Sequence, residues 1–115
     1  VRVRINLASN TACPEAILSR LAADHAAPVR ARVAANRATP TNVLGLLAAA
    51  GSSPGSLAGN PRTSIDDLEL LSNHPNSAVR VAVARNESTP AWVLAFLARD
   101  RSPVVRSAVK DNAAS

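Results

Sequence analysis

The chain has 115 residues and a formal net charge of +5, carried almost wholly by arginine, since Lys110 is the only lysine. Hydrophobic residues make up 47% of the chain but aromatic residues only 2%, so a core must consist of Leu, Val, Ile and Ala. The single cysteine, Cys13, excludes an internal disulfide and a cysteine-rich metal site. No apolar run approaches the roughly 18 residues of a membrane span. We therefore expect a cytoplasmic protein with no cofactor, no metal and no membrane contact.

One asparagine recurs at steps of 26, 24, 26 and 26 residues, and aliphatic residues recur with it. The asparagines are Asn10, Asn36, Asn60, Asn86 and Asn112. Three positions before them lie Leu7, Val33, Leu57, Val83 and Val109. Eight and eleven positions after them lie Leu18, Leu44, Leu68 and Leu94, and then Leu21, Leu47, Leu71 and Leu97. A fixed period of this size predicts stacked units, none of which can bury its apolar face alone.

The sequence thus predicts a single repeat domain over 1–115, with units at about 1–28, 29–52, 53–78, 79–104 and a partial unit at 105–115. Because the chain opens and closes inside units, we interpret it as a segment of a longer protein. Its ends should then expose apolar column residues, and the isolated segment could associate end to end. The residues expected to be exposed are Val3, Leu7, Val105 and Val109.

In the first unit, Cys13 takes a position held by threonine in the next three units, and we expect it to be a small N-cap or a buried thiol. The second unit shows the general pattern: Val29, Val33 and Ala34 form the stripe of a short helix that ends at Asn36. That helix, the shorter of the two, is either α or 3₁₀. Asparagine is expected to end it in the left-handed conformation or through its side chain. Thr39-Pro40 then begins a second helix, with Thr as N-cap and Pro at the first helical position.

The third unit is two residues short, and a Gly- and Ser-rich stretch, 51–56, replaces the start of its first helix. Its second helix carries Asp66, Asp67 and Glu69, and Asp67 occupies a column that is otherwise aliphatic. Acids suit the first turn of a helix, and Ile65 is expected to supply the apolar packing that Asp67 does not provide. The unit is therefore either a degenerate structural unit or a bend with a binding notch. The fourth unit returns to the regular pattern, and the fifth contains only its first half.

The pattern from Val29-Arg30 to Leu47-Ala48, and again from Val79-Arg80 to Leu97-Ala98, resembles the leucine-rich repeat variant family. The resemblance covers nearly the whole chain. It implies an all-α fold, a right-handed superhelical solenoid of alternating α and 3₁₀ helices with about four and a half two-helix repeats of 24–26 residues. It implies no catalytic activity. Some members carry a cysteine-bound iron–sulfur cluster ahead of the repeats, but Cys13 alone cannot hold one.

Two sets of surface residues are candidates for partner binding. One column holds Arg4, Arg30, Arg80 and Arg106, which can bind phosphate or carboxylate, or can be solvated or paired with nearby aspartates. Trp92 and Phe96, one helical turn apart, form either an interface or a packing contact with a following unit. The asparagines are expected to be a structural ladder.

His25 and His74 are expected to be solvated, and neither has a nucleophile or second ligand arranged around it. The sequence therefore predicts a non-enzymatic binding or scaffold module for a protein partner. The alternative is binding of nucleic acid or another polyanion through the Arg column.

Overall fold

The computed structural model describes residues 2–112, which contain nine α-helices and no strand. The helices are α1 (Arg2–Ser9), α2 (Glu15–Leu21), α3 (Ala27–Ala35), α4 (Thr41–Ala49), α5 (Pro54–Gly59), α6 (Ile65–Leu71), α7 (Ser77–Arg85), α8 (Ala91–Leu97) and α9 (Pro103–Lys110). The prediction of an all-helical chain is confirmed for this range. None of these helices has the length and apolar character needed to cross a bilayer.

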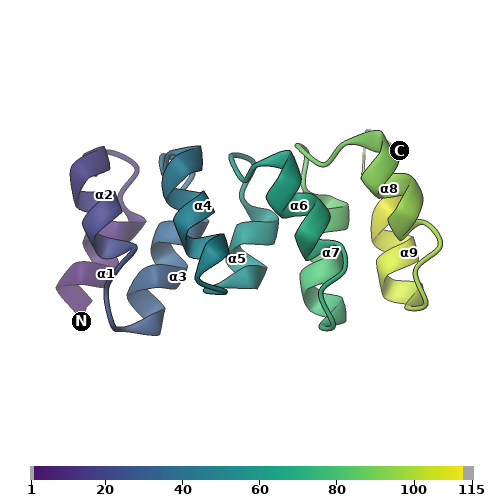
Figure 1. The fold of residues 1–115 in the computed structure, drawn as a ribbon, viewed down its shortest axis with the longest axis horizontal. Coiled ribbons are helices and arrows are strands. Elements are labelled where there is room, and N and C mark those ends of the chain that lie inside the picture. The colour runs from purple at the N-terminus through teal and green to yellow at the C-terminus, as the bar shows by residue number, and fades with distance from the viewer. Residues whose placement is uncertain (1, 113–115) are drawn as a thin grey trace.

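The helices are arranged in two layers along one axis, from the N-terminal α1 at one end to α9 at the other (Figure 1). The odd-numbered helices pack on one another in sequence, α1 on α3, α3 on α5, α5 on α7 and α7 on α9. The even-numbered helices lie in front of them in Figure 1 and pack mainly on the odd-numbered layer. The described part of the chain measures 41 × 22 × 20 Å. The odd-numbered layer therefore forms the continuous body of the molecule, and the even-numbered layer forms one of its faces.

The helices before the asparagines differ from the expectation in two ways. They are α-helical, whereas the resemblance implied 3₁₀ helices in alternation. They are also not the shorter ones, since α3 and α4 both have nine residues and α7 has nine against seven for α8. The expected unit boundaries at 28, 78 and 104 fall inside α3, α7 and α9, so the turns between units lie a few residues earlier than the periodicity suggested.

The predicted leucine columns form the core. The leucines eight and eleven positions after each asparagine are all buried: Leu18, Leu44, Leu68, Leu94, Leu21, Leu47, Leu71 and Leu97. They extend from the even-numbered helices toward the odd-numbered layer, where valines and alanines complete the packing. At about 1.5–3 kcal/mol for each fully buried aliphatic side chain, these columns are the main stabilising contribution of each unit.

The valines of the odd-numbered helices face the preceding unit. Val29, Val33, Val105 and Val109 are buried, whereas the equivalent Val3 of α1, which has no described unit before it, is 72% exposed. The expectation that both ends expose this column is therefore correct for Val3 and Leu7 but wrong for Val105 and Val109, which α7 covers. The expectation failed because periodicity reveals which residues share a face but not toward which neighbour that face is turned.

The asparagines join successive units through their side chains, and we call Asn10, Asn36, Asn60, Asn86 and Asn112 the Asn ladder. The Nδ2 group of Asn60 donates to the carbonyl oxygens of Ala34 (2.7 Å) and Asn36 (3.0 Å) in the unit before it. Its Oδ1 accepts from the backbone N–H of Arg62 (2.9 Å). Asn36, Asn86 and Asn112 donate to the equivalent carbonyl pairs of their preceding units. Each ladder step therefore satisfies two carbonyl groups of the preceding unit.

The backbone at these helix ends differs from the prediction. Asn36 is extended, with φ −73° and ψ 120°, and not left-handed, because its side chain must reach the preceding unit. Thr39 is not an N-cap: its hydroxyl donates to the carbonyl of Val33 (2.7 Å), at the end of the helix before it. Pro40 takes the N-cap position, one residue before the helix. The Thr-Pro pair therefore closes one helix and starts the next, and Thr63 and Thr89 donate in the same way to Leu57 and Val83.

The shortened third unit has the least regular backbone of the described chain. Its first helix, α5, has only six residues and follows two positions with positive φ, Gly51 (69°) and Ser53 (52°). Ile65 is 52% exposed, so the expectation that it packs in place of an aliphatic residue at position 67 is wrong. The space beside Asp67 is instead a small cavity of about 150 Å³, whose lining also includes Leu57 and Leu71. The unit thus contains a notch as well as a short helix.

Leu71→Ala is expected to destabilise the fold although it lies in this irregular unit. Leu71 is 7% exposed and belongs to the core, and a buried Leu→Ala change costs about 2–5 kcal/mol. Urea unfolding would measure the loss. The neighbouring Leu70, 65% exposed, is the matched control, because Leu70→Ala should cost less than about 0.5 kcal/mol. Equal losses for the two variants would show that the third unit packs differently from this description.

Candidate partner-binding surface

Arg80 makes the most buried ion pair of the described residues. It lies on α7, is 4% exposed, and pairs with Asp100 at Nε–Oδ2 2.9 Å and Nη2–Oδ1 3.2 Å. Its Nη1 donates to the carbonyl oxygens of His74 (2.7 Å) and Pro75 (3.1 Å). All three nitrogens of the guanidinium are thus bound within the protein. Arg80 ties α7 to the turns before it and after α8, so its role in the structure is to join helices.

The other three members of the Arg column are bound in part. Arg4 pairs with Asp24 at 2.6 Å, which is the same relation as Arg80 to Asp100. Arg30 has Ala50 where those units have an aspartate, and it donates to the Ser52 hydroxyl (3.1 Å) and the Asp24 carbonyl (2.6 Å). Arg106 is exposed and donates to the Asp100 carbonyl (2.6 Å). The column therefore runs along the turns between units, and pairing with nearby aspartates, one of the two alternatives, describes Arg4 and Arg80.

The two aspartates that pair with this column both ionise more readily than usual. A hydrogen bond from the backbone N–H of Ala26 lowers the pKa of Asp24, with the charge and hydrogen bond of Arg4 adding to it against the effect of burial. Burial raises the pKa of Asp100, but hydrogen bonds from Arg80 and Ser102 and the charges of Arg80 and Arg101 outweigh it, so the pKa is lowered overall. Both groups are therefore carboxylates at neutral pH, and both favour the folded state when ionised.

Acid should destabilise the protein through these two groups. A carboxylate whose folded-state pKa is lowered contributes stability above its unfolded-state pKa of about 3.9 and loses it as the pH falls through the folded value. We expect the free energy of unfolding to be nearly constant from neutral pH to about pH 5 and to fall below about pH 4. Urea unfolding across this range would measure it. The variant Asp24→Asn/Asp100→Asn, though less stable at neutral pH, should show a flatter dependence, and an unchanged acid slope would contradict this assignment.

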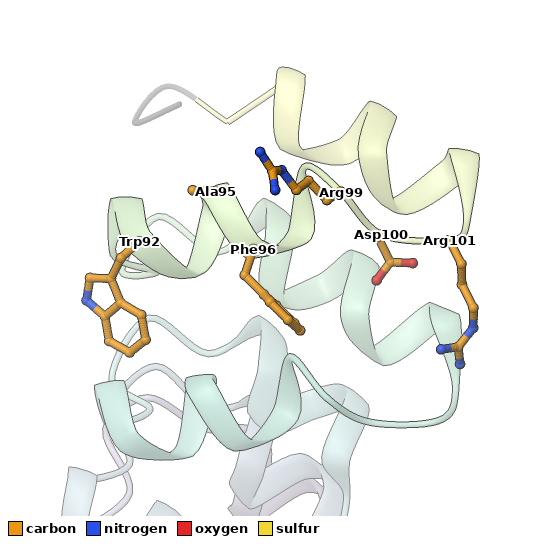
Figure 2. Close-up of a pocket in the computed structure, with 6 residues that line it drawn as sticks. All are labelled: Trp92, Ala95, Phe96, Arg99, Asp100 and Arg101. Carbon is orange, nitrogen blue, oxygen red and sulfur yellow. The ribbon is translucent and has the colours of Figure 1, made fainter.

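The two aromatic residues are exposed on α8. Trp92 and Phe96 are each 54% exposed, as the column of Trp92 with Ala16, Asn42 and Asp66 suggested. Figure 2 shows both rings extending from the same side of α8, with Arg99 on the other side of the helix. Their surroundings include an open hollow of about 660 Å³ at the end of α8, lined also by Arg99, Asp100 and Arg101. The structure thus brings the aromatic pair and one end of the Arg column's ion-pair network to neighbouring positions.

Leu46 and Leu70 extend the aromatic pair into a longer exposed surface. They are 60% and 65% exposed and occupy the column of Phe96 on α4 and α6. We call Leu46, Leu70, Phe96 and Trp92 the apolar ridge. Sequence analysis missed the two leucines because each is followed directly by a core leucine, so they looked like part of the buried stripe. Their spacing of 24 and 26 residues to Leu70 and Phe96 was the signal that could have found them.

Clefts lie between the even-numbered helices beside this ridge. One of about 180 Å³ separates α6 from α8 and is lined by Trp92, Phe96, Val93, Glu69, Ser72 and Asn73. Another of about 230 Å³ separates α2 from α4 and contains Glu15 and small polar residues but no aromatic ring. The even-numbered face is therefore grooved, and its apolar content increases toward the C-terminal end.

The remaining candidate residues show no arrangement for catalysis or metal binding. Cys13 is a buried thiol whose Sγ lies 3.8 Å from the carbonyl oxygen of Pro14. The side chain of His25 is 91% exposed, as expected, whereas His74 is half-buried and its Nδ1 accepts from the N–H of Asn76 (3.0 Å). Within residues 2–112 no group of three His, Cys, Asp or Glu side chains could hold a metal ion. No protein-family model, curated protein or solved structure matches the chain.

Proposed function

We propose that the chain is a non-enzymatic binding module, a right-handed solenoid of the leucine-rich repeat variant type whose even-numbered face holds a protein partner. The apolar ridge carries this proposal. Four large apolar side chains, each more than half exposed, lie on three successive even-numbered helices. Single exposed apolar residues are ordinary, but an aligned set with two aromatic members is typical of protein interfaces.

A comparison of retained proteins tests the proposal. The tagged chain would be incubated with an extract of its source cells beside the variant Leu46→Ser/Leu70→Ser/Phe96→Ser, and bound proteins would be quantified by mass spectrometry. Val104→Ser is the matched control, because Val104 is 61% exposed but lies on α9, away from the ridge. We expect at least one protein to bind the wild type and Val104→Ser and to be lost from the ridge variant. An identical set on all three chains would contradict the proposal.

The polyanion alternative has less support, because Arg80 is buried and the other three column arginines already donate to groups of the protein. A labelled oligonucleotide titrated across a salt series would test it. Phosphate contacts would make the affinity fall steeply with salt. Absence of binding even at low salt would remove the alternative and leave the apolar ridge as the candidate surface.

A further inference from the structure

The acidic residues of this basic protein are concentrated on α6. Asp66, Asp67 and Glu69 lie within seven residues that include no base. Elsewhere, Asp24 and Asp100 are paired with arginines, and Glu87 lies 3.9 Å from Arg37. Among the described residues, none of the three α6 carboxylates forms an ion pair or accepts a side-chain hydrogen bond. The even-numbered face therefore has a local negative charge beside its apolar ridge.

Helix stability explains two of these acids but not the third. Asp66 and Asp67 are in the first turn of α6, where the helix dipole favours negative charge. Glu69 is in the last turn, where the dipole disfavours it. The backbone carbonyl of Glu69 accepts from the Ser72 hydroxyl (2.5 Å) and the Asn73 amide (3.3 Å), but its carboxylate has no partner in residues 2–112. The position of Glu69 thus has no structural reason.

Glu69 shares its cleft with both aromatic rings of the molecule. The cleft between α6 and α8, about 180 Å³, is lined by Glu69 on one side and by Trp92 and Phe96 on the other. Figure 2 shows both rings pointing to the same side of α8, so their exposed surfaces are available together. A carboxylate and aromatic faces are complementary to one kind of group, a flat cation with an aliphatic stem.

We infer that the cleft between α6 and α8 receives an arginine side chain of the protein partner, with the guanidinium against Trp92 and Glu69 and the stem against Phe96. Arginine fits better than lysine because its planar group both stacks on an aromatic ring and presents paired donors to a carboxylate. The inference rests on the proposed function, because it specifies the chemistry of that partner. It predicts that the partner segment combines this arginine with apolar residues that cover Leu46 and Leu70.

Trp92 allows a direct test, because it is the only tryptophan of the chain. N-α-acetyl-arginine amide would be titrated at low salt while Trp92 fluorescence and the backbone NMR signals of α6 and α8 are followed. N-α-acetyl-norleucine amide, which has a stem but no charge, and N-α-acetyl-lysine amide are the comparison compounds. We expect saturable binding of the arginine compound, weaker binding of the lysine compound and none of the norleucine compound over the same range.

Matched variants identify the carboxylate. Glu69→Gln should weaken arginine binding by up to about fivefold, the effect of one exposed ion pair. Glu15→Gln, which neutralises the carboxylate in the equivalent cleft without aromatic residues, should leave binding unchanged. Phe96→Leu, which introduces the residue that α4 and α6 have in this column, should also weaken it. Circular dichroism of each variant would verify that it is folded.

Three outcomes would overturn the inference: no saturable signal, equal binding of the norleucine or lysine compound, or no effect of Glu69→Gln. The failure of this inference is distinguishable from that of the proposed function. A ridge-dependent partner without arginine binding would remove only the arginine assignment. Arginine binding without any ridge-dependent partner would leave the cleft as a cation site and contradict the proposed function.

Discussion

Asn60→Ala is expected to be among the most destabilising single substitutions in this chain. Asn60 is 2% exposed, and its side chain binds the Ala34 and Asn36 carbonyls and the N–H of Arg62. Alanine would leave these backbone groups without that partner, and a buried polar group left unsatisfied costs about 1–3 kcal/mol. We expect the free energy of unfolding to fall by at least about 3 kcal/mol in urea titrations.

Asn10 provides the matched control at the start of the ladder. It is exposed, its Oδ1 accepts from the N–H of Ala12 (2.9 Å), and no acceptor for its Nδ2 lies within the described residues. Asn10→Ala should therefore cost only about 1 kcal/mol. Asn60→Asp should be at least as harmful as Asn60→Ala, because it places an acceptor against two carbonyl oxygens. Similar small losses for Asn10→Ala and Asn60→Ala would show that the ladder bonds do not hold the units together.

Arg80→Ala is the second substitution with a large expected effect. It removes one partner of a buried ion pair and leaves Asp100, whose side chain is 8% exposed, without its compensating charge. Removal of one partner of such a pair typically costs about 3–5 kcal/mol, mainly because the remaining charge is buried. Thermal or urea unfolding at neutral pH would measure the loss. Arg80→Lys should recover only part of it, because an ammonium cannot reproduce the fork of contacts to Asp100 and His74.

The equivalent pair in the first unit separates burial from mere pairing. Arg4 pairs with Asp24 at 2.6 Å, but its side chain is 37% exposed. Arg4→Ala should therefore cost no more than about 1 kcal/mol, as for solvent-exposed pairs. If Arg4→Ala and Arg80→Ala destabilise the protein equally, burial of the pair does not determine its contribution.

Much of the fold could be predicted from the sequence because the repeat averages out local ambiguity. A single stripe such as Val43, Leu44 and Leu47 is weak evidence, but its recurrence around four asparagines identifies helices and core together. What periodicity lacks is direction. It places Val3 and Val105 in one column, yet only the packing of α9 on α7 shows that this column is turned toward the preceding unit.

The candidate surface was harder to predict, for two physical reasons. Exposed leucines next to core leucines, as at Leu46 and Leu70, have the same sequence signature as buried ones, so only the structure separates them. The Arg column looked like a surface feature because arginine is usually exposed, whereas its members reach turns of the same protein. Trp92 was identifiable because its column holds small or polar residues in every other unit.

Every bond of the Asn ladder reaches backward along the chain: Asn36, Asn60, Asn86 and Asn112 each donate to carbonyl oxygens of an earlier unit. The valines of the odd-numbered helices are also turned toward the preceding helix. Each unit therefore needs only a surface that has already been synthesised when its own residues are added. Chains grow from the N-terminus at about 5–20 residues per second, slowly compared with the formation of a helix. The molecule can thus assemble in the order of its translation, with each finished unit acting as the template on which the next one orders as it leaves the ribosome.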